Sequence, residues 1–176
     1  IASILIVVVA LAVVPASRYF VLNTVGVRSS SSVIVLDQKT SQPLKNVEVS
    51  IASQSSKTDK EGRVQLNGIK LGPQQLVIKK PAFAEVNQKV TIGWGSNPLG
   101  QMKLTPVGSQ YTFRLSDFIS NKPVKDAEAT SGESSAVANS DGEIVLTLPN
   151  TKEAEVEVEI SANNYRTEKL KLEVAN

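Results

Sequence analysis

The sequence predicts an all-β protein: two tandem antiparallel β-sandwiches preceded by one transmembrane helix. Three observations lead to this prediction. An apolar segment opens the chain, a strand-rich pattern recurs after eighty residues, and no segment past residue 30 has a convincing helical period. We expect an anchor with its juxtamembrane segment at residues 1–28, a first sandwich at 29–107 and a second at 108–176. A chain of 176 residues has room for one or two domains.

The apolar segment at the start nearly has the length needed to cross a bilayer. Residues 1–14 contain no charged side chain, and the apolar character resumes at residues 19–22 after Arg18. About 20 apolar residues span the hydrocarbon core, and a Tyr-Phe pair beside an arginine suits the membrane surface. A signal peptide cleaved near Pro15 and a buried core segment are the alternatives. The anchor, with the lipid bilayer as its partner, is the preferred interpretation, although Arg18 and Arg28 are too few to set its orientation.

The repeat relates pairs of segments at one constant offset. Residues 33–49 and 113–129 each contain an aspartate, then a Pro-aliphatic pair, then an alternating strand pattern. Acidic-Gly turns at residues 61–62 and 141–142 each lead into another alternating strand. Eighty residues is enough for a small domain with its own core, so the pattern predicts a duplicated domain and not a solenoid.

Strand patterns follow one another along the first copy. The serines at residues 29–32 are expected to form a flexible link. Residues 47–51 alternate, and residues 76–78 form a continuous apolar run that suits a strand buried on both faces. Residues 90–92 and 101–104 are further strands, separated by a Gly-Trp-Gly loop. Short strands with closely spaced turn signals indicate an antiparallel sandwich.

The end of the chain has the clearest strand pair. Residues 155–160 and 169–174 alternate strictly, and residues 162–165 between them tolerate turn conformations. A hairpin places the aliphatic side chains of both strands on the inner face and opposes glutamates to lysines on the outer face. Because such cross-strand pairs contribute only roughly 0.2–1 kcal/mol each, burial of the aliphatics is expected to decide the fold.

These motifs resemble the carboxypeptidase regulatory-like domain, a seven-stranded, Ig-like or prealbumin-like (transthyretin-like) sandwich. In the first copy the matching positions are Asp37, Pro43, Leu44, Val47, Val49, Gly62, Val64, Leu66 and Phe83. In the second copy they are Asp117, Pro123, Val124, Ala127, Ala129, Gly142, Ile144, Leu146 and Tyr165. The resemblance covers residues 32–175 and implies a non-catalytic accessory module outside the cytoplasm. Ser41 and Asn121 stand where the family usually has glycine in the first turn, so the turn type is open.

The residue types restrict the chemistry. Cysteine and histidine are absent, which excludes Ser-His-Asp and Cys-His catalysis, disulfides and ordinary zinc sites. No glycine-rich phosphate-binding loop is present. The remaining carboxylates lie on turns and alternating strand faces, so we expect no enzyme, no catalytic residue and no cofactor.

Two further kinds of site are weighed and not expected. Asp59 with Glu61, and Asp141 with Glu143, fall short of the six to eight oxygens that calcium requires, so both are interpreted as plain turns without a metal. A Lys–Asn isopeptide bond, known from related pilin-like sandwiches, is not expected because neither first strand contains a lysine.

The two copies differ in charge and in Trp94. Residues 30–108 contain ten basic and five acidic residues, a net charge of +5, whereas residues 109–176 contain seven and twelve, a net charge of −5. The preferred interpretation is that both surfaces are merely solvated, because exposed ion pairs contribute little. The alternatives are contact between the oppositely charged copies and attraction of the basic copy to anionic lipid. Trp94, the only tryptophan, is a candidate contact for a sugar or another surface polymer. The preferred alternative is a ring that covers an open end of the sandwich or the junction of the copies.

Together these observations predict a membrane-anchored, extracytoplasmic, non-catalytic tandem β-sandwich protein, single-pass in the cell membrane. Its role would be that of a structural, scaffold or binding module at the cell envelope. An envelope protein or polysaccharide is the expected partner, and nucleic acid is not. The alternative is a carbohydrate- or ligand-binding accessory module of an envelope enzyme or transporter complex, with Trp94 at its site. Cleavage of the leader, followed by secretion, is a third possibility.

Overall fold

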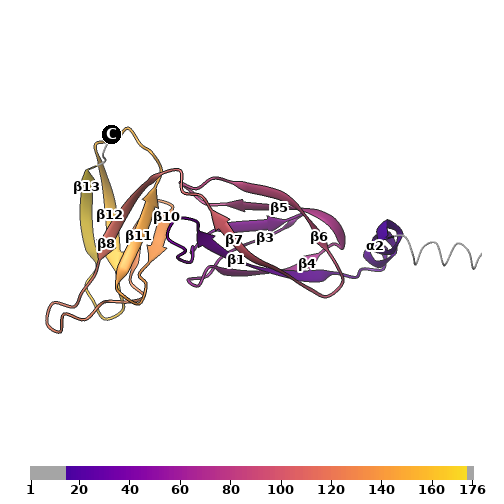
Figure 1. The fold of residues 1–176 in the computed structure, drawn as a ribbon, viewed down its shortest axis with the longest axis horizontal. Helices are drawn as coiled ribbons and strands as arrows, with labels where there is room; N and C mark the ends of the chain where they lie inside the picture. The colour runs from indigo at the N-terminus through magenta and orange to yellow at the C-terminus, as the bar shows by residue number, and fades with distance from the viewer. Residues whose placement is uncertain (1–14, 174–176) are drawn as a thin grey trace, which may run out of the picture.

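The computed structural model describes residues 15–173, and over this range the predicted all-β class is confirmed (Figure 1). The helix is α2 (Pro15–Thr24). The strands in chain order are β1 (Ser29–Asp37), β2 (Glu48–Ile51), β3 (Gln54–Lys57), β4 (Arg63–Ile69), β5 (Gly72–Lys79), β6 (Val86–Ile92), β7 (Ser96–Leu104), β8 (Ser109–Arg114), β9 (Glu128–Ser131), β10 (Ser134–Val137), β11 (Glu143–Leu148), β12 (Glu155–Ser161) and β13 (Glu168–Glu173).

Strands β1 to β7 form two sheets that we call the N-terminal sandwich. One sheet has the order β4-β1-β7, and the other has the order β3-β2-β5-β6. β1 lies between an antiparallel neighbour, β4, and a parallel neighbour, β7. Alternate side chains point inward, so that Val35 from one sheet and Val49 and Leu76 from the other are fully buried in a shared core.

The serines at residues 29–32 are not the flexible link that their composition predicts. They form the first half of β1 and pair with both β4 and β7. The Ser29 hydroxyl donates to the Gly93 carbonyl at 2.7 Å, and the Ser31 hydroxyl donates to the Asn97 carbonyl at 2.9 Å. These carbonyls belong to the β6–β7 loop and to the start of β7, more than sixty residues away, so local composition cannot reveal the role of the serines.

Strands β8 to β13 form two further sheets, the C-terminal sandwich, with the orders β11-β8 and β10-β9-β12-β13. Ile144 and Leu146 of β11 and Val158 of β12 are fully buried in a separate core. β8 pairs with β11 as β1 pairs with β4. Within residues 15–173, however, no strand lies on the other edge of β8, the edge that corresponds to the one where β7 covers β1.

The predicted terminal hairpin is confirmed as β12 and β13. Glu157 lies opposite Lys171, and Val158 lies opposite Leu170. The Lys169 ammonium donates to the Glu157 carboxylate at 3.0 Å, and this hydrogen bond raises the pKa of Lys169. Burial of the aliphatics is less complete than expected, because Val158 is fully buried whereas Leu170 is 40% exposed.

The first turn of each copy has the conformation that glycine favours although the residue is not glycine. Ser41 has a φ of 59° and Asn121 a φ of 54°. The backbone N–H of each donates to the carbonyl of the aspartate four residues earlier, Asp37 or Asp117, at 2.9 and 2.8 Å. The turn geometry is therefore the same in both copies despite the departure from the family pattern.

The predicted membrane anchor falls largely on residues 1–14, which lie outside the described residues. The described part of that segment is α2, and no helix within residues 15–173 has the length and hydropathy to cross a membrane. The division of the rest of the chain into independent domains at residues 29–107 and 108–176 stays a prediction.

Candidate functional site

The loop between β6 and β7 presents Trp94 on a framework of hydrogen bonds. The side-chain oxygen of Asn97 accepts the Gly93 N–H at 2.8 Å. Its amide nitrogen donates to the carbonyls of Ser30, Gly93 and Gly95 at 3.1 to 3.2 Å. One asparagine side chain therefore closes the loop and attaches it to β1.

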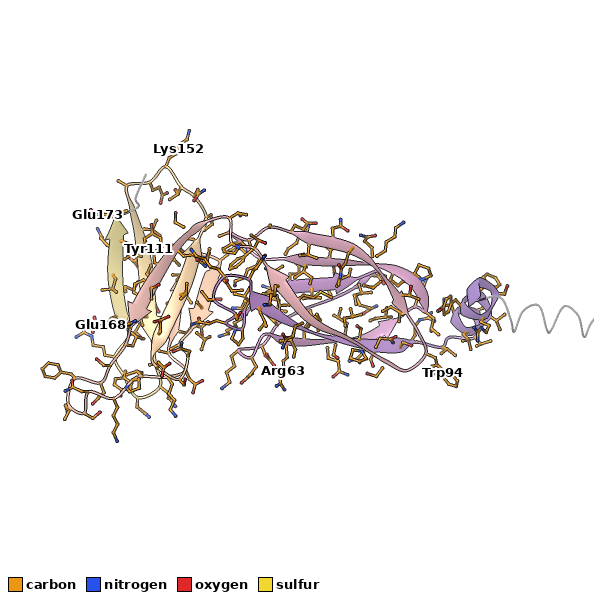
Figure 2. All side chains as sticks on the ribbon, viewed as in Figure 1. Arg63, Trp94, Tyr111, Lys152, Glu168 and Glu173 are labelled. Atoms are coloured by element: carbon orange, nitrogen blue, oxygen red, sulfur yellow. The ribbon has the colours of Figure 1, made fainter. Side chains whose placement is uncertain are left out.

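The prediction that Trp94 covers an open end of the sandwich or the junction of the copies is wrong. The side chain is 78% exposed. Figure 2 labels Trp94 at the end of the N-terminal sandwich that lies away from the C-terminal sandwich, the end that also carries α2. Tryptophan usually buries most of its area, but here the closed loop holds the backbone so that the ring points to solvent. The ring face is thus free to stack on a planar or sugar ring.

The helix α2 is docked on this same end of the N-terminal sandwich. The Asn23 amide nitrogen donates to the Leu71 carbonyl at 3.0 Å, and its oxygen accepts the Leu71 N–H at 2.9 Å. The Tyr19 ring packs on Gly72, where an added Cβ would lie 3.1 Å from the ring. Phe20 and Val25 are exposed beside these contacts. The end of the molecule that carries Trp94 therefore has several apolar side chains open to solvent.

The junction between the two sandwiches is held by polar contacts. The Lys45 ammonium lies 2.6 Å from the Glu128 carboxylate, and the Gln110 amide donates to the buried Asp37 carboxylate at 3.1 Å. The Asn46 side-chain amide also donates to the Ser135 hydroxyl of the C-terminal sandwich at 3.2 Å. These contacts agree with the interpretation that opposite charges draw the copies together, and they fix one sandwich on the end of the other.

A cleft of about 690 Å³ opens at this junction. The N-terminal sandwich contributes Asn46, Lys57, Lys80 and Phe83 to its walls, and the C-terminal sandwich contributes Glu133 and Ser135. Its walls mix charged, polar and apolar groups, which suits a polar ligand or a neighbouring chain better than an apolar small molecule.

Lys80 is the buried cation of this cleft. Its ammonium donates to the Lys45 carbonyl at 2.7 Å. Burial lowers the pKa of Lys80 to about 8, and the nearby Glu128 carboxylate opposes this shift. Lys80 cannot be recognised from the sequence, because its position before a proline carries no sign of burial.

In both acidic turns, one side chain accepts hydrogen bonds from the backbone N–H groups of the turn itself. The Asp59 carboxylate accepts the N–H groups of Glu61 and Arg63 at 3.0 and 2.7 Å. In the second copy the Asn139 side chain occupies the equivalent position, and its oxygen accepts the N–H groups of Asp141 and Glu143. The neutral Asn139 amide accepts the same backbone hydrogen bonds as the Asp59 carboxylate, so these hydrogen bonds do not need the negative charge of Asp59. The interpretation of both segments as turns is confirmed.

Comparison with known proteins finds likenesses of fold. No protein-family model and no curated protein matches the chain. The Bacillus anthracis TIE protein matches over 85% of this chain and 31% of its own, with 14% identity and a TM-score of 0.42. A streptococcal ancillary pilin matches over 85% of this chain and 59% of its own length, with 12% identity and a TM-score of 0.39. A DUF3823 family protein from Parabacteroides merdae matches over 84% of this chain and 81% of its own length, with 11% identity and a TM-score of 0.42.

The chain spans less than two thirds of the first two of these structures. Likenesses of this strength carry no statement about activity or partner. The β-sandwich architecture is established by the strand order and the two buried cores, whereas the resemblance to the carboxypeptidase regulatory-like domain stays a prediction.

Proposed function

We propose that this chain is a non-catalytic spacer and binding module of the cell envelope, tethered to a membrane by its apolar N-terminal segment. The observation that carries the proposal is the end-to-end order of the molecule. The helix α2 lies at one end, the N-terminal sandwich lies in the middle and the C-terminal sandwich lies at the other end (Figure 1). Such an order holds the C-terminal sandwich away from whatever surface binds the N-terminal segment.

The exposed side chains near α2 support the proposal. Phe20 in α2, Val25 just after it and Trp94 in the loop between β6 and β7 are each at least 70% exposed. Tryptophan and other amphipathic aromatic side chains favour the interface between membrane and water. Asn23 fixes α2 to the sandwich through Leu71, so a tethered molecule would stand on this end.

Cell fractionation tests the tether and the side of the membrane. The full chain and a chain that lacks residues 1–28 are expressed in the same cells, and membranes are washed with alkaline carbonate. We expect the full chain in the membrane pellet, open to protease added from outside, and the shortened chain in the soluble fraction. A full chain that washes off, or that protease cannot reach from outside, contradicts the proposal. The N-terminal residue of the mature chain separates the tether from a cleaved leader.

A second function, carbohydrate binding, is favoured by one observation: the ring of Trp94 is 78% exposed on a closed loop. Because Trp94 is the only tryptophan, its fluorescence reports directly on any ring that stacks against it. Titration with envelope polysaccharides should quench or shift this emission, and calorimetry on Trp94→Ala should lose the binding. A flat response across many polymers removes this candidate.

A further inference from the structure

Segments that are distant in sequence meet at the end of the N-terminal sandwich that carries α2 and Trp94, which we call the α2 end. Backbone pairing brings Arg28, Lys70 and Trp94 to it. Ser29 follows Arg28 and pairs with Ile69, the residue before Lys70. The Ser29 hydroxyl also donates to the carbonyl of the residue before Trp94 at 2.7 Å. Three separate loops therefore contribute one basic or aromatic side chain each to the same end.

The charged side chains of the α2 end are all basic. Arg18 lies in α2, Arg28 follows this helix, and Lys70 lies between β4 and β5. All three are exposed, and none forms a salt bridge with any other residue from 15 to 173. Surface charges of a soluble domain usually alternate in sign, so three cations without a carboxylate among them mark this end as distinct.

The acidic residues of the N-terminal sandwich lie at its opposite end, where the C-terminal sandwich joins it. β1 runs away from the α2 end and finishes at Asp37, and Glu48 pairs with Lys79 at the far end of β5. The other three lie in the turns before β4 and β6, strands that both begin at this far end. The five residues are Asp37, Glu48, Asp59, Glu61 and Glu85. The sandwich therefore has one purely basic end and one end of mixed charge.

Exposed apolar side chains accompany the cations of the α2 end. Phe20 is 72% exposed, Val25 is 70% exposed and Trp94 is 78% exposed. Aromatic rings favour the interface between membrane and water, and basic side chains near it are attracted to anionic headgroups. The combination of uncompensated cations with exposed aromatic rings therefore matches the headgroup region of an anionic bilayer in both respects.

A structural role accounts for only part of this charge. The Arg28 guanidinium donates to the Val27 and Asn23 carbonyls at 2.7 and 3.1 Å, where a positive charge also suits the C-terminal end of α2. A guanidinium has five N–H donors, so Arg28 keeps donors for a phosphate. The Lys70 ammonium makes no hydrogen bond with any residue from 15 to 173. Its charge is therefore available for a ligand outside the chain.

We propose that the α2 end binds the surface of a bilayer that contains anionic lipid. Arg28 and Lys70 contact lipid phosphates, and the Trp94 ring enters the headgroup region beside them. The apolar segment that leads into α2 brings this end to the bilayer, and the sign of its charge selects the anionic lipid. This inference rests on the proposed tether and adds to it the class of lipid that the folded end recognises. On a bilayer without anionic lipid the tether holds the chain, but the sandwich does not stand on this end.

Fluorescence of Trp94, the only tryptophan, tests the proposal on the full chain. The chain is reconstituted into vesicles of phosphatidylcholine alone and into vesicles with roughly 30% phosphatidylglycerol, both with a fraction of lipid brominated near the headgroup. We expect the anionic vesicles to shift the emission to shorter wavelength and to quench it about twofold more strongly than the neutral vesicles. Because the Debye length falls to about 3 Å at 1 M salt, this difference should disappear in about 1 M sodium chloride. Equal quenching in both kinds of vesicle overturns the proposal.

Charge reversal at two ends of the sandwich locates the contact. Lys70→Glu should remove at least half of the difference between the two kinds of vesicle. Lys103→Glu, an equally exposed position near the far end of β7, makes the same change of charge and should leave the difference intact. Should Lys70→Glu disturb the neighbouring contact of α2 with Leu71, the neutral Lys70→Gln should still reduce the difference. Equal effects of Lys70→Glu and Lys103→Glu overturn the proposal, because the attraction would then depend on net charge alone.

Two further outcomes separate this inference from its alternatives. Soluble polygalacturonate is added to the neutral vesicles, and an emission shift as large as that in anionic vesicles overturns the proposal in favour of an anionic polymer. Flotation of the same vesicles reports on the tether by itself. A chain that floats with both kinds of vesicle but shows equal quenching loses this inference and keeps the proposed function. A chain that floats with neither loses both.

Discussion

Lys45 and Glu128 join the two sandwiches through one ion pair, with the ammonium 2.6 Å from the carboxylate. The two residues are not equivalent in the repeat. Lys45 corresponds to Lys125 of the second copy, and Glu128 corresponds to Glu48 of the first. Both side chains are somewhat under one third exposed, so water screens this pair less than an ordinary surface pair. The ion pair therefore joins two positions that are not equivalent in the two copies of the repeat.

Glu128→Gln should loosen the junction while both sandwiches stay folded. We expect a loss of about 1 kcal/mol in the free energy of unfolding, since the pair is half-buried and Lys45 then keeps an uncompensated charge. Glu48→Gln changes the equivalent residue, which forms no salt bridge with the part of the chain that the structure describes, and is the matched control. Urea unfolding with Lys45→Met as the second variant gives a double-mutant cycle. A coupling energy of zero contradicts the role assigned to the pair.

Lys80 should make stability rise with pH. Its folded-state pKa is about 8, against an ordinary value of 10.5. Below pH 8 the amine is charged in both the folded and the unfolded chain, so the folded state bears the full cost of burying it. Between pH 8 and 10.5 the unfolded chain binds a proton that the folded chain has lost, and stability therefore increases with pH.

This pH dependence is measured by comparison with Lys80→Met. From pH 8 to 10.5 the free energy of unfolding of the natural chain should increase by about 1–3 kcal/mol relative to that of Lys80→Met. Lys79→Met, at the exposed neighbouring position, is the control for removing a lysine side chain from this strand. Parallel pH profiles for the natural chain and Lys80→Met would show that Lys80 is not buried as a cation.

Gly62→Ala should be much more costly than Gly100→Ala. Both glycines have positive φ, 71° and 74°, so alanine meets similar backbone strain at each. A Cβ at Gly62 would lie 2.5 Å from the Val35 carbonyl oxygen, whereas nothing lies within 4 Å of one at Gly100. We expect a loss of about 1 kcal/mol at Gly100 and about 2–4 kcal/mol at Gly62. Equal losses in thermal unfolding would mean that the Gly62 turn has room to shift.

Trp94→Ala should leave the stability of the fold nearly unchanged. The ring is 78% exposed, so its removal should alter the free energy of unfolding by no more than about 0.5 kcal/mol. Ile92→Ala, two residues away and fully buried, should cost about 2–5 kcal/mol and is the contrasting control. A large loss at Trp94 would show that the ring packs against the protein and is not free for a ligand.

Strands and turns could be predicted because their determinants are local. The alternation in β12 and β13 fixes which side chains share a face, and Glu157 indeed lies opposite Lys171. The turn at Ser41 was recognisable from its neighbours even without glycine, because the Asp37 side chain accepts the N–H groups of the turn within three residues. Each of these contacts is made inside one short segment.

Other features could not be predicted because their partners are distant in sequence. Residues 29–32 resemble a linker in composition and become a strand only because β4 and β7 are there to pair with them. The direction of the Trp94 ring depends on the hydrogen bonds of Asn97 to Ser30, more than sixty residues earlier. Lys80 becomes a buried cation only where the two sandwiches meet.

The sequence by itself determined the repeat, the all-β class and the positions of the turns, since a period of two and an acidic-Gly turn are properties of adjacent residues. Only the tertiary structure decided which strand edges are covered. β1 and β8 have equivalent sequences around them, yet β1 lies between two strands and β8 has one neighbour within residues 15–173. Strand pairing depends on which segments meet in space, and for that reason the place of β7 beside β1 and the exposed Trp94 became visible only in the folded chain.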